Sequence, residues 1–304
     1  METKKKLDSK KNSKQEFRFS LLMLLPALLF LFVLIGYPLG KVIYDSFFNV
    51  HLINDEISGF AYFDNFSKVM RDERFLPALI NTCIWTIASV CGEYIIGLGS
   101  AILLNKKFYG RTFFRIATFI PWLVPIIVAG MTWSWMLNPD YGIVNYALSK
   151  IGIIESPINF LGDPKYALGT VIFVNIWRSF PYFTISFLAA LQTIPESLYE
   201  AVSIDGGGKV RQFLHVTLPQ LKSTSIIIIF MHLIWTAINF DFIWVMTQGG
   251  PNYATQTLPL LIYRYSMQKF DVGAASALST LLMISMTICF VIYLKIKNKS
   301  DDNA

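Results

Sequence analysis

The sequence predicts an all-α transmembrane protein with six membrane-spanning helices, and three observations lead to this class. Hydrophobic residues make up 54% of the 304 residues and charged residues only 15%, whereas an ordinary soluble domain carries roughly 25% charged residues. The apolar residues gather in six long stretches with almost no charge, each long enough to cross a bilayer as a helix. Lysines and arginines are divided unevenly between the connections. Because lipid offers no partner to a free backbone N–H or C=O, the crossings are predicted to be helical.

The predicted spans follow from these weakly charged stretches. Only Glu93, Arg178 and Asp241 carry a charge inside them. The six ranges are Phe19–Gly40, Leu79–Leu104, Ile116–Pro139, Leu168–Leu191, Ser223–Met246 and Val272–Leu294. Three cysteines lie inside apolar runs without the spacing of a metal site or a disulfide framework, so we expect buried thiols and no metal.

The first span could be a cleaved signal peptide or a retained anchor helix. Its apolar run is longer than the usual 7 to 15 residues of a signal peptide, and Gly36-Tyr37-Pro38-Leu39 offers no small-residue cleavage site. We therefore expect a retained anchor. The predicted organisation is a basic cytoplasmic tail (1–18), a first membrane helix (19–44), an extracellular loop (45–78), a five-helix core (79–294) and a cytoplasmic tail (295–304).

The orientation follows from the basic residues. If the N-terminus is inside, the inner segments hold more than twice as many lysines and arginines as the outer connections. This asymmetry predicts that both termini are cytoplasmic. The net charge of +6 is then explained by anionic lipid headgroups at the inner surface, and no nucleic-acid partner is expected.

The inner connection over residues 192–222 is the most informative segment. Thr193 and Pro195 suit the start of a short helix, and Glu196 complements its positive N-terminus. The glycines after Asp205 end this helix, and Pro219 limits a second one. Two helices of about ten residues need a surface to pack against, which is either the inner face of the membrane or a cytoplasmic partner.

The residues of this connection resemble the EAA loop of binding-protein-dependent ABC importer permeases. The run Glu200-Ala201-Val202-Ser203-Ile204-Asp205-Gly206-Gly207, followed by Phe213 and then Leu218-Pro219, is similar to the family pattern EAAxxDGA, phenylalanine, LP. Val202 and Gly207 depart mildly from it, as does Ser223, where proline is common. Leu191–Glu196 and Gly249-Gly250-Pro251 resemble the carbohydrate-uptake branch, the maltose and glycerol-phosphate type. The similarity in layout extends over residues 79–294.

This resemblance implies a six-helix type-1 importer domain in a bacterial plasma membrane. Its partners would be a second permease chain, usually a different one in this branch, two cytoplasmic ATPases that bind ATP-Mg, and an extracellular solute-binding protein that docks at Gly249, Gly250 and Pro251. The solute would be a sugar or a related compound. The residues implied to couple the chain to an ATPase are Glu200, Ala201, Asp205, Gly206, Phe213, Leu218 and Pro219.

Polar and aromatic side chains within the spans are candidates for solute contact. An ionised group near the bilayer centre costs roughly 2.5–3.5 kcal/mol on insertion scales, so such groups usually face a cavity or a partner. Sugars suit a lining of aromatic rings and amides. The candidates are Trp133, Asn175, Tyr182, Asn239 and Asp241. The alternatives are an ion pair between Glu93 and Arg178, and tryptophans that belong to the interfacial belt.

Other classes find less support in the sequence. A phosphate loop would need glycine at Ser203 and Ser or Thr at Val210, so the chain is not expected to be an enzyme or to bind a cofactor itself. An ion-coupled secondary transporter is the main alternative, although no internal repeat of two halves is visible. A membrane scaffold without a solute path is a third possibility, which the long inner motif disfavours.

Overall fold

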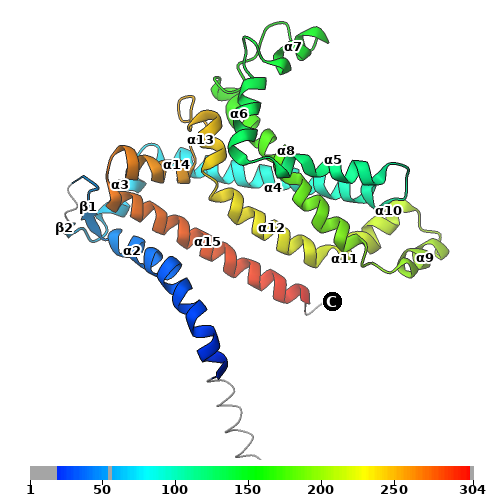
Figure 1. Ribbon diagram of the computed structural model, residues 1–304, viewed down its shortest axis with the longest axis horizontal. Helices are drawn as coiled ribbons and strands as arrows, with labels where there is room; N and C mark the ends of the chain where they lie inside the picture. The colour runs from blue at the N-terminus through cyan, green and yellow to red at the C-terminus, as the bar shows by residue number, and fades with distance from the viewer. Residues whose placement is uncertain (1–18, 54–56, 302–304) are drawn as a thin grey trace, which may run out of the picture.

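The computed structural model describes residues 19–53 and 57–301, so the predicted basic tail over residues 1–18 lies outside the described residues. Long helices that run roughly side by side form an elongated body, and the N-terminal helix diverges from it (Figure 1). The protein is mostly helical, as the sequence predicts.

Four described helices are long and apolar enough to cross a membrane, and two bent helix pairs raise the number to six if each pair is one span. This finding agrees with the predicted transmembrane class. The four helices are Phe19–Asp45, which contains η1 (Phe32–Gly36) and α2 (Tyr37–Asp45), α4 (Phe75–Asn105), α8 (Pro164–Leu191) and α15 (Val272–Asp301).

The third predicted span is broken, and the expectation of one unbroken helix over Ile116–Pro139 is wrong. Helices α5 (Arg111–Leu123) and α6 (Ile126–Met136) meet at 94°. The break lies at Val124, whose backbone is extended, directly before Pro125. A proline ring disfavours the helical conformation of the preceding residue, which ends α5 at this point.

The fifth predicted span also differs from an unbroken crossing. Helix α12 (Lys222–Ala237) forms a bent pair with the segment over Lys209–Gln220, at 63°. It ends before Asp241, and a separate helix, α13 (Asp241–Thr247), follows. Asn239 accepts a hydrogen bond through Oδ1 from the Phe242 N–H at 3.1 Å, which stabilises the new helix start.

The described part of the predicted loop over residues 45–78 contains a short ribbon, which the all-α class did not anticipate. Strands β1 (Phe48–Val50) and β2 (Ile57–Phe60) pair antiparallel, and α3 (Asp64–Met70) follows. The other short elements are α7 (Ile143–Lys150), α9 (Glu196–Ile204), α10 (Lys209–Gln212), η2 (Phe213–Thr217), α11 (Leu218–Gln220), α14 (Leu258–Tyr263) and η3 (Arg264–Gln268).

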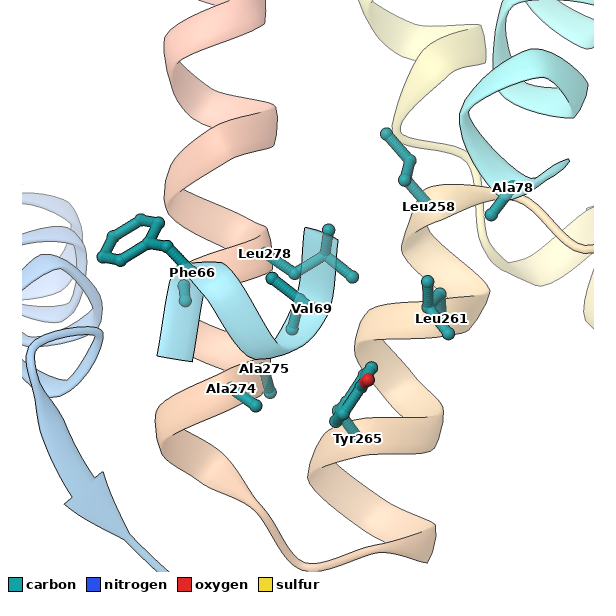
Figure 2. Packing of buried hydrophobic residues seen from close by; sticks show 10 residues of the cluster. Phe66, Val69, Ala78, Leu258, Leu261, Tyr265, Ala274, Ala275 and Leu278 are labelled. Atoms are coloured by element: carbon teal, nitrogen blue, oxygen red, sulfur yellow. The ribbon is translucent and has the colours of Figure 1, made fainter. Parts of the chain in front are cut away.

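Buried apolar residues form three clusters along the body. One, which includes Phe66, Leu261 and Leu278, lies at the end formed by α3, α14, η3 and the start of α15 (Figure 2). A second joins α4, α6, α8 and α13, and a third joins α4, α8 and α12. The three cysteines are free, but Cys83, Cys91 and Cys289 are exposed, so the expectation of buried thiols is wrong.

Helices α4 and α8 approach closely because α4 carries glycines at the contact. A Cβ atom added to Gly97 would lie 2.4 Å from Phe183 Cβ and 3.1 Å from the Phe180 carbonyl oxygen. Small residues of this kind allow membrane helices to pack backbone to backbone.

Replacing Gly97 by alanine is therefore expected to force the two helices apart. Overpacking of this kind typically costs about 1–3 kcal/mol, so the thermal unfolding temperature of the purified protein in detergent should fall. Gly99→Ala is the matched control, because nothing lies within 4 Å of a Cβ atom added to Gly99. Equal unfolding temperatures for the two variants would contradict the close packing at Gly97.

A charged network stabilises the end of the body that contains the ribbon. Asp72 accepts hydrogen bonds from Arg74 Nη2 at 2.6 Å and from the Tyr265 hydroxyl, and Lys269 Nζ lies 3.5 Å from the same carboxylate. The bond from Arg74 holds the pKa of Asp72 well below its usual range. Burial, together with the bond to Asp72, raises the pKa of Tyr265.

This network predicts a loss of stability in acid. A carboxyl group whose pKa is lower in the folded state stabilises the fold at pH values above its unfolded-state pKa, about 3.9 for aspartate. This contribution is lost as the pH falls from that value through the folded-state pKa. For a partly exposed group we expect roughly 1 kcal/mol. Asp72→Asn should therefore unfold at lower temperature than the wild type at pH 7, and the gap should narrow below about pH 4. Glu155→Gln, at an exposed loop position, should show no gap at either pH.

Candidate functional site

The connection between α8 and α12, predicted as the coupling loop, protrudes from one end of the body (Figure 1). Helix α9 begins after Pro195 and contains no buried residue. Thr193 does not cap it, because its hydroxyl donates to the Ala190 carbonyl at 2.8 Å instead. Proline at the N-cap position fixes an extended entry to the helix without a side-chain cap.

The turn after α9 depends on two glycines. Gly206 has a φ of +76°, the N–H of Gly206 donates to Ser203 O at 3.0 Å, and the N–H of Gly207 donates to Val202 O at 2.8 Å. This pair of bonds is the Schellman motif, which satisfies the last carbonyls of a helix. A Cβ atom on Gly207 would lie 2.5 Å from Val202 Cγ1, so the turn also requires a small residue at this position.

Polar side chains hold α9 against the segment that follows it. The Tyr199 hydroxyl lies 3.1 Å from Thr217 Oγ1, and Gln212 Nε2 donates to Ser203 Oγ at 2.8 Å and to Tyr199 O at 3.3 Å. Phe213 packs against the cluster formed by α4, α8 and α12. Tyr199 and Gln212 were not singled out from the sequence, although a tyrosine one helical turn before Ser203 is the available signal.

Most of the residues predicted for coupling are exposed on the loop. Glu200, Ala201, Asp205 and Gly206 are all exposed, and they lie together on α9 and at its end. The face also presents apolar side chains: Ile204 is 86% exposed and Val210 73%. Leu218 and Pro219, predicted for the same role, are exposed in α11. An exposed apolar and acidic surface of this kind is typical of a site that a partner covers.

A second site lies between three spans, where a buried carboxylate is bound from two sides. Glu93 of α4 is fully buried. It accepts a hydrogen bond through Oε1 from Asn175 Nδ2 of α8 at 3.0 Å, and its Oε2 lies 2.8 Å from His232 Nδ1 of α12. This contact requires one proton between the two atoms, carried by Nδ1 where the carboxyl group is ionised and by Oε2 where it is neutral. These three residues, which we call the Glu93 cluster, link the three helices.

Aromatic rings cover the Glu93 cluster on one side. The Tyr182 ring lies 4.7 Å from the His232 ring, and the Trp235 ring lies 5.4 Å from it. Trp122 of α5 lies 6.4 Å from Tyr182. Trp235 is 50% exposed and Trp122 42%, so the two indoles present open ring surface beside the cluster.

Arg178 lies where α5 and α6 meet. Its Nε donates to the Val124 carbonyl at 3.3 Å, a carbonyl that the helix break leaves outside the regular helical ladder. The alternative of a direct pair between Arg178 and Glu93 is not what the structure shows, because His232 and Asn175 occupy the two carboxylate oxygens. Non-helical backbone at membrane depth is tolerated where it is buried in protein or lines a cavity.

The structure brings two of the predicted solute-contact residues, Asn175 and Tyr182, into this site. The other three lie elsewhere: Trp133 packs against Phe173 and Trp177, Asn239 caps α13, and Asp241 is exposed in the first turn of that helix. The hydrogen bonds and ring contacts of the described residues do not join these three to the Glu93 cluster.

The segment predicted for binding-protein docking forms a tight turn after α13. Gly249 is buried, with a φ of +83°, and Gly250 O accepts a hydrogen bond from Thr255 Oγ1 at 2.7 Å. Pro251 is half-buried, while Asn252 and Tyr253 are exposed. The glycines and the proline shape the turn, and the two residues after them form its surface.

Comparisons with known proteins match nearly the whole chain. A family model described as the inner membrane component of binding-protein-dependent transport systems matches residues 93–299. The sulfoquinovosyl glycerol transport system permease protein SmoG of Agrobacterium fabrum is 34% identical over 93% of this chain and 91% of that protein. The trehalose/maltose transport system permease protein MalF of Thermococcus litoralis is 34% identical over 95% of this chain and 98% of that protein.

A solved structure shares the fold. A chain of a bacterial ABC transporter involved in the import of the acidic polysaccharide alginate superposes with a TM-score of 0.80 at 22% identity, over 96% of this chain and 98% of that chain. The two chains therefore share one fold over nearly their full lengths.

Proposed function

The chain belongs to the family of inner membrane components of binding-protein-dependent transport systems, and from this membership we propose that it forms, with a second permease chain, the solute pathway of an ATP-driven importer. It is a multi-pass protein of the bacterial inner membrane. The observation that carries the proposal is the exposed surface of the loop over residues 192–222, which has the chemistry of a docking site and is joined to the spans through the packing of Phe213.

The loop provides a mechanical connection to a partner ATPase. Glu200 offers a carboxylate to a basic residue of that subunit, Ala201 permits close approach, and the apolar Ile204 and Val210 would be buried on docking. Because Tyr199 and Gln212 join α9 to the segment that follows it, and Phe213 packs that segment against the spans, a displacement of α9 would pass to α8 and α12. ATP-Mg binds to the two partner ATPases, and this chain carries out no hydrolysis itself.

The solute pathway lies beside the Glu93 cluster in this proposal. Exposed indole surface suits the C–H faces of a sugar ring, and the nearby polar groups suit its hydroxyls. Relatives named for sulfoquinovosyl glycerol and for trehalose and maltose support a sugar or sugar derivative as the solute. The extracellular binding protein would deliver it near Asn252 and Tyr253, and both chain termini would lie in the cytoplasm.

Trp235 tests this pathway directly. Trp235→Ala is expected to raise the KM of uptake severalfold, because ring contacts contribute about 0.5–1.5 kcal/mol beyond the apolar area that they bury. Trp135→Ala is the control, since Trp135 is also exposed but lies at the end of α6.

Asn239→Ala and Asp241→Asn should be assayed in parallel, and unchanged uptake in both would remove these two residues from the pathway.

The assembly is tested by gentle purification of the tagged chain from its native membrane. A second permease chain and an ATPase should copurify with the wild type, and the ATPase should be lost with Glu200→Arg. An ion-coupled secondary transporter is the alternative. If the chain purifies only with itself and moves solute without ATP, the importer proposal is wrong and the chain is a secondary transporter.

A further inference from the structure

A cavity of about 330 Å³ lies between the ends of two spans and the base of the loop over residues 192–222. Ile102 of α4, Leu191 of α8 and Phe213 of η2 form an apolar part of its wall. Lys106 and Lys209 reach it from two segments that are distant in the sequence. The lining of the cavity therefore combines apolar side chains with two cationic ones.

Within the described part of the chain, the two lysines have no acidic partner. The ion pairs of the described residues include Lys41, Lys68 and Lys269, each with an aspartate, and they include neither Lys106 nor Lys209. No carboxylate belongs to the described lining of the cavity. Two cations that share a cavity without a counter-charge repel each other and favour an anionic occupant.

The position of the cavity identifies the kind of anion. Lys106 directly follows the last residue of α4, and Leu191 is the last residue of α8, so the cavity lies at the ends of two spans. With the inward orientation of the proposed function, these ends are on the side of the inner leaflet. Basic pockets at the cytoplasmic side of membrane helices are suited to lipid headgroups. A free phosphate ion would match the lysines but would leave the apolar wall without a partner.

We propose that this cavity binds an anionic phospholipid of the inner leaflet, with its phosphate beside Lys106 and Lys209 and an acyl chain against Ile102, Leu191 and Phe213. The proposal rests on the inward orientation in the proposed function. The cavity is lined both by Gln212, which bonds to α9, and by Phe213, which packs against the spans. The bound lipid therefore stabilises the loop in the position from which it contacts the ATPase. Anionic lipid then raises the coupling of ATP hydrolysis to uptake.

The direct test measures lipid retained by the purified permease. The chain is exchanged into nanodiscs of phosphatidylcholine with a small fraction of phosphatidylglycerol, extracted in detergent, and analysed by native mass spectrometry. The wild type should retain phosphatidylglycerol, and Lys106→Gln/Lys209→Gln should bind it roughly tenfold or more weakly, since each lysine near an anionic surface contributes about a fivefold change in binding. Lys106→Arg/Lys209→Arg, which keeps both charges, should retain the lipid.

A matched control separates the cavity from general charge. Lys107→Gln/Arg211→Gln removes the same charge from the same two segments, at positions outside the cavity lining, and should bind phosphatidylglycerol like the wild type. Equal loss in both double variants would overturn the proposal. Displacement of the lipid by millimolar inorganic phosphate would overturn it in favour of a free-anion site, and displacement on addition of the ATPase would assign the cavity to that partner.

The transport readout distinguishes this proposal from the proposed function. In reconstituted complexes, ATP-driven uptake by the wild type should rise severalfold when phosphatidylglycerol is added to phosphatidylcholine, and the Lys106→Gln/Lys209→Gln variant should lose this rise. Uptake that depends on ATP but not on the lipid would refute the lipid site and leave the importer proposal intact. Uptake that does not depend on ATP would refute the importer.

Discussion

Replacement of Gly206 by valine is expected to abolish ATP-driven uptake while the chain remains folded in the membrane. Gly206 has a φ of +76°, a conformation that costs a non-glycine residue about 1–2 kcal/mol and a β-branched residue more. The two hydrogen bonds that close α9 depend on this conformation. Without them the direction of the chain after Asp205 changes, and the exposed face of α9 no longer matches the ATPase.

Gly208→Val is the matched control for this result. Gly208 lies in the same exposed turn, but its backbone is extended, with a φ of −77°, and nothing lies within 4 Å of an added Cβ atom. We expect at least a tenfold loss of uptake and of ATPase copurification with Gly206→Val, and nearly wild-type values with Gly208→Val. Similar uptake for both variants would show that coupling does not require the left-handed turn.

The second large effect is expected at Glu93, because its side chain is shared by three spans. Glu93→Ala would remove the acceptor of Asn175 and the partner of His232, and would leave both side chains buried and unpaired. Each buried polar group that is left unpaired typically costs about 1–3 kcal/mol, and two are left here. The variant should therefore unfold at a markedly lower temperature in detergent and accumulate poorly in the membrane.

Glu93→Gln separates the hydrogen bonds from the charge. The glutamine carbonyl can accept from Asn175, and its amide can donate to His232 Nδ1 in the other neutral tautomer. We expect this variant to lose less than about 1.5 kcal/mol and to retain uptake. A loss as large as that of Glu93→Ala would mean that the cluster requires an ionised carboxylate. Unfolding temperatures of both variants, measured with uptake in proteoliposomes, decide between the two.

The most reliable predictions were those that depend on residues close together in the sequence. The low charge and the length of the apolar runs determined the membrane class, since a chain of this composition has no other way to bury its surface. The run from Glu200 to Pro219 determined the family before any contact was known, because the spacing of such a motif is local. The break at Val124 could also have been predicted, from the proline that follows it.

The contacts between distant residues were decided by the tertiary structure alone. Glu93 lies 139 positions from His232, and several polar partners within the spans were possible from the sequence, including Arg178. Which of them meet depends on how α4, α8 and α12 rotate against one another, and close packing sets that rotation through contacts such as Gly97 with Phe183. The sequence by itself therefore determined the class and the loop of this protein, because both are local properties. Only the tertiary structure decided the Glu93 cluster and the cationic cavity, because each exists where separate helices meet.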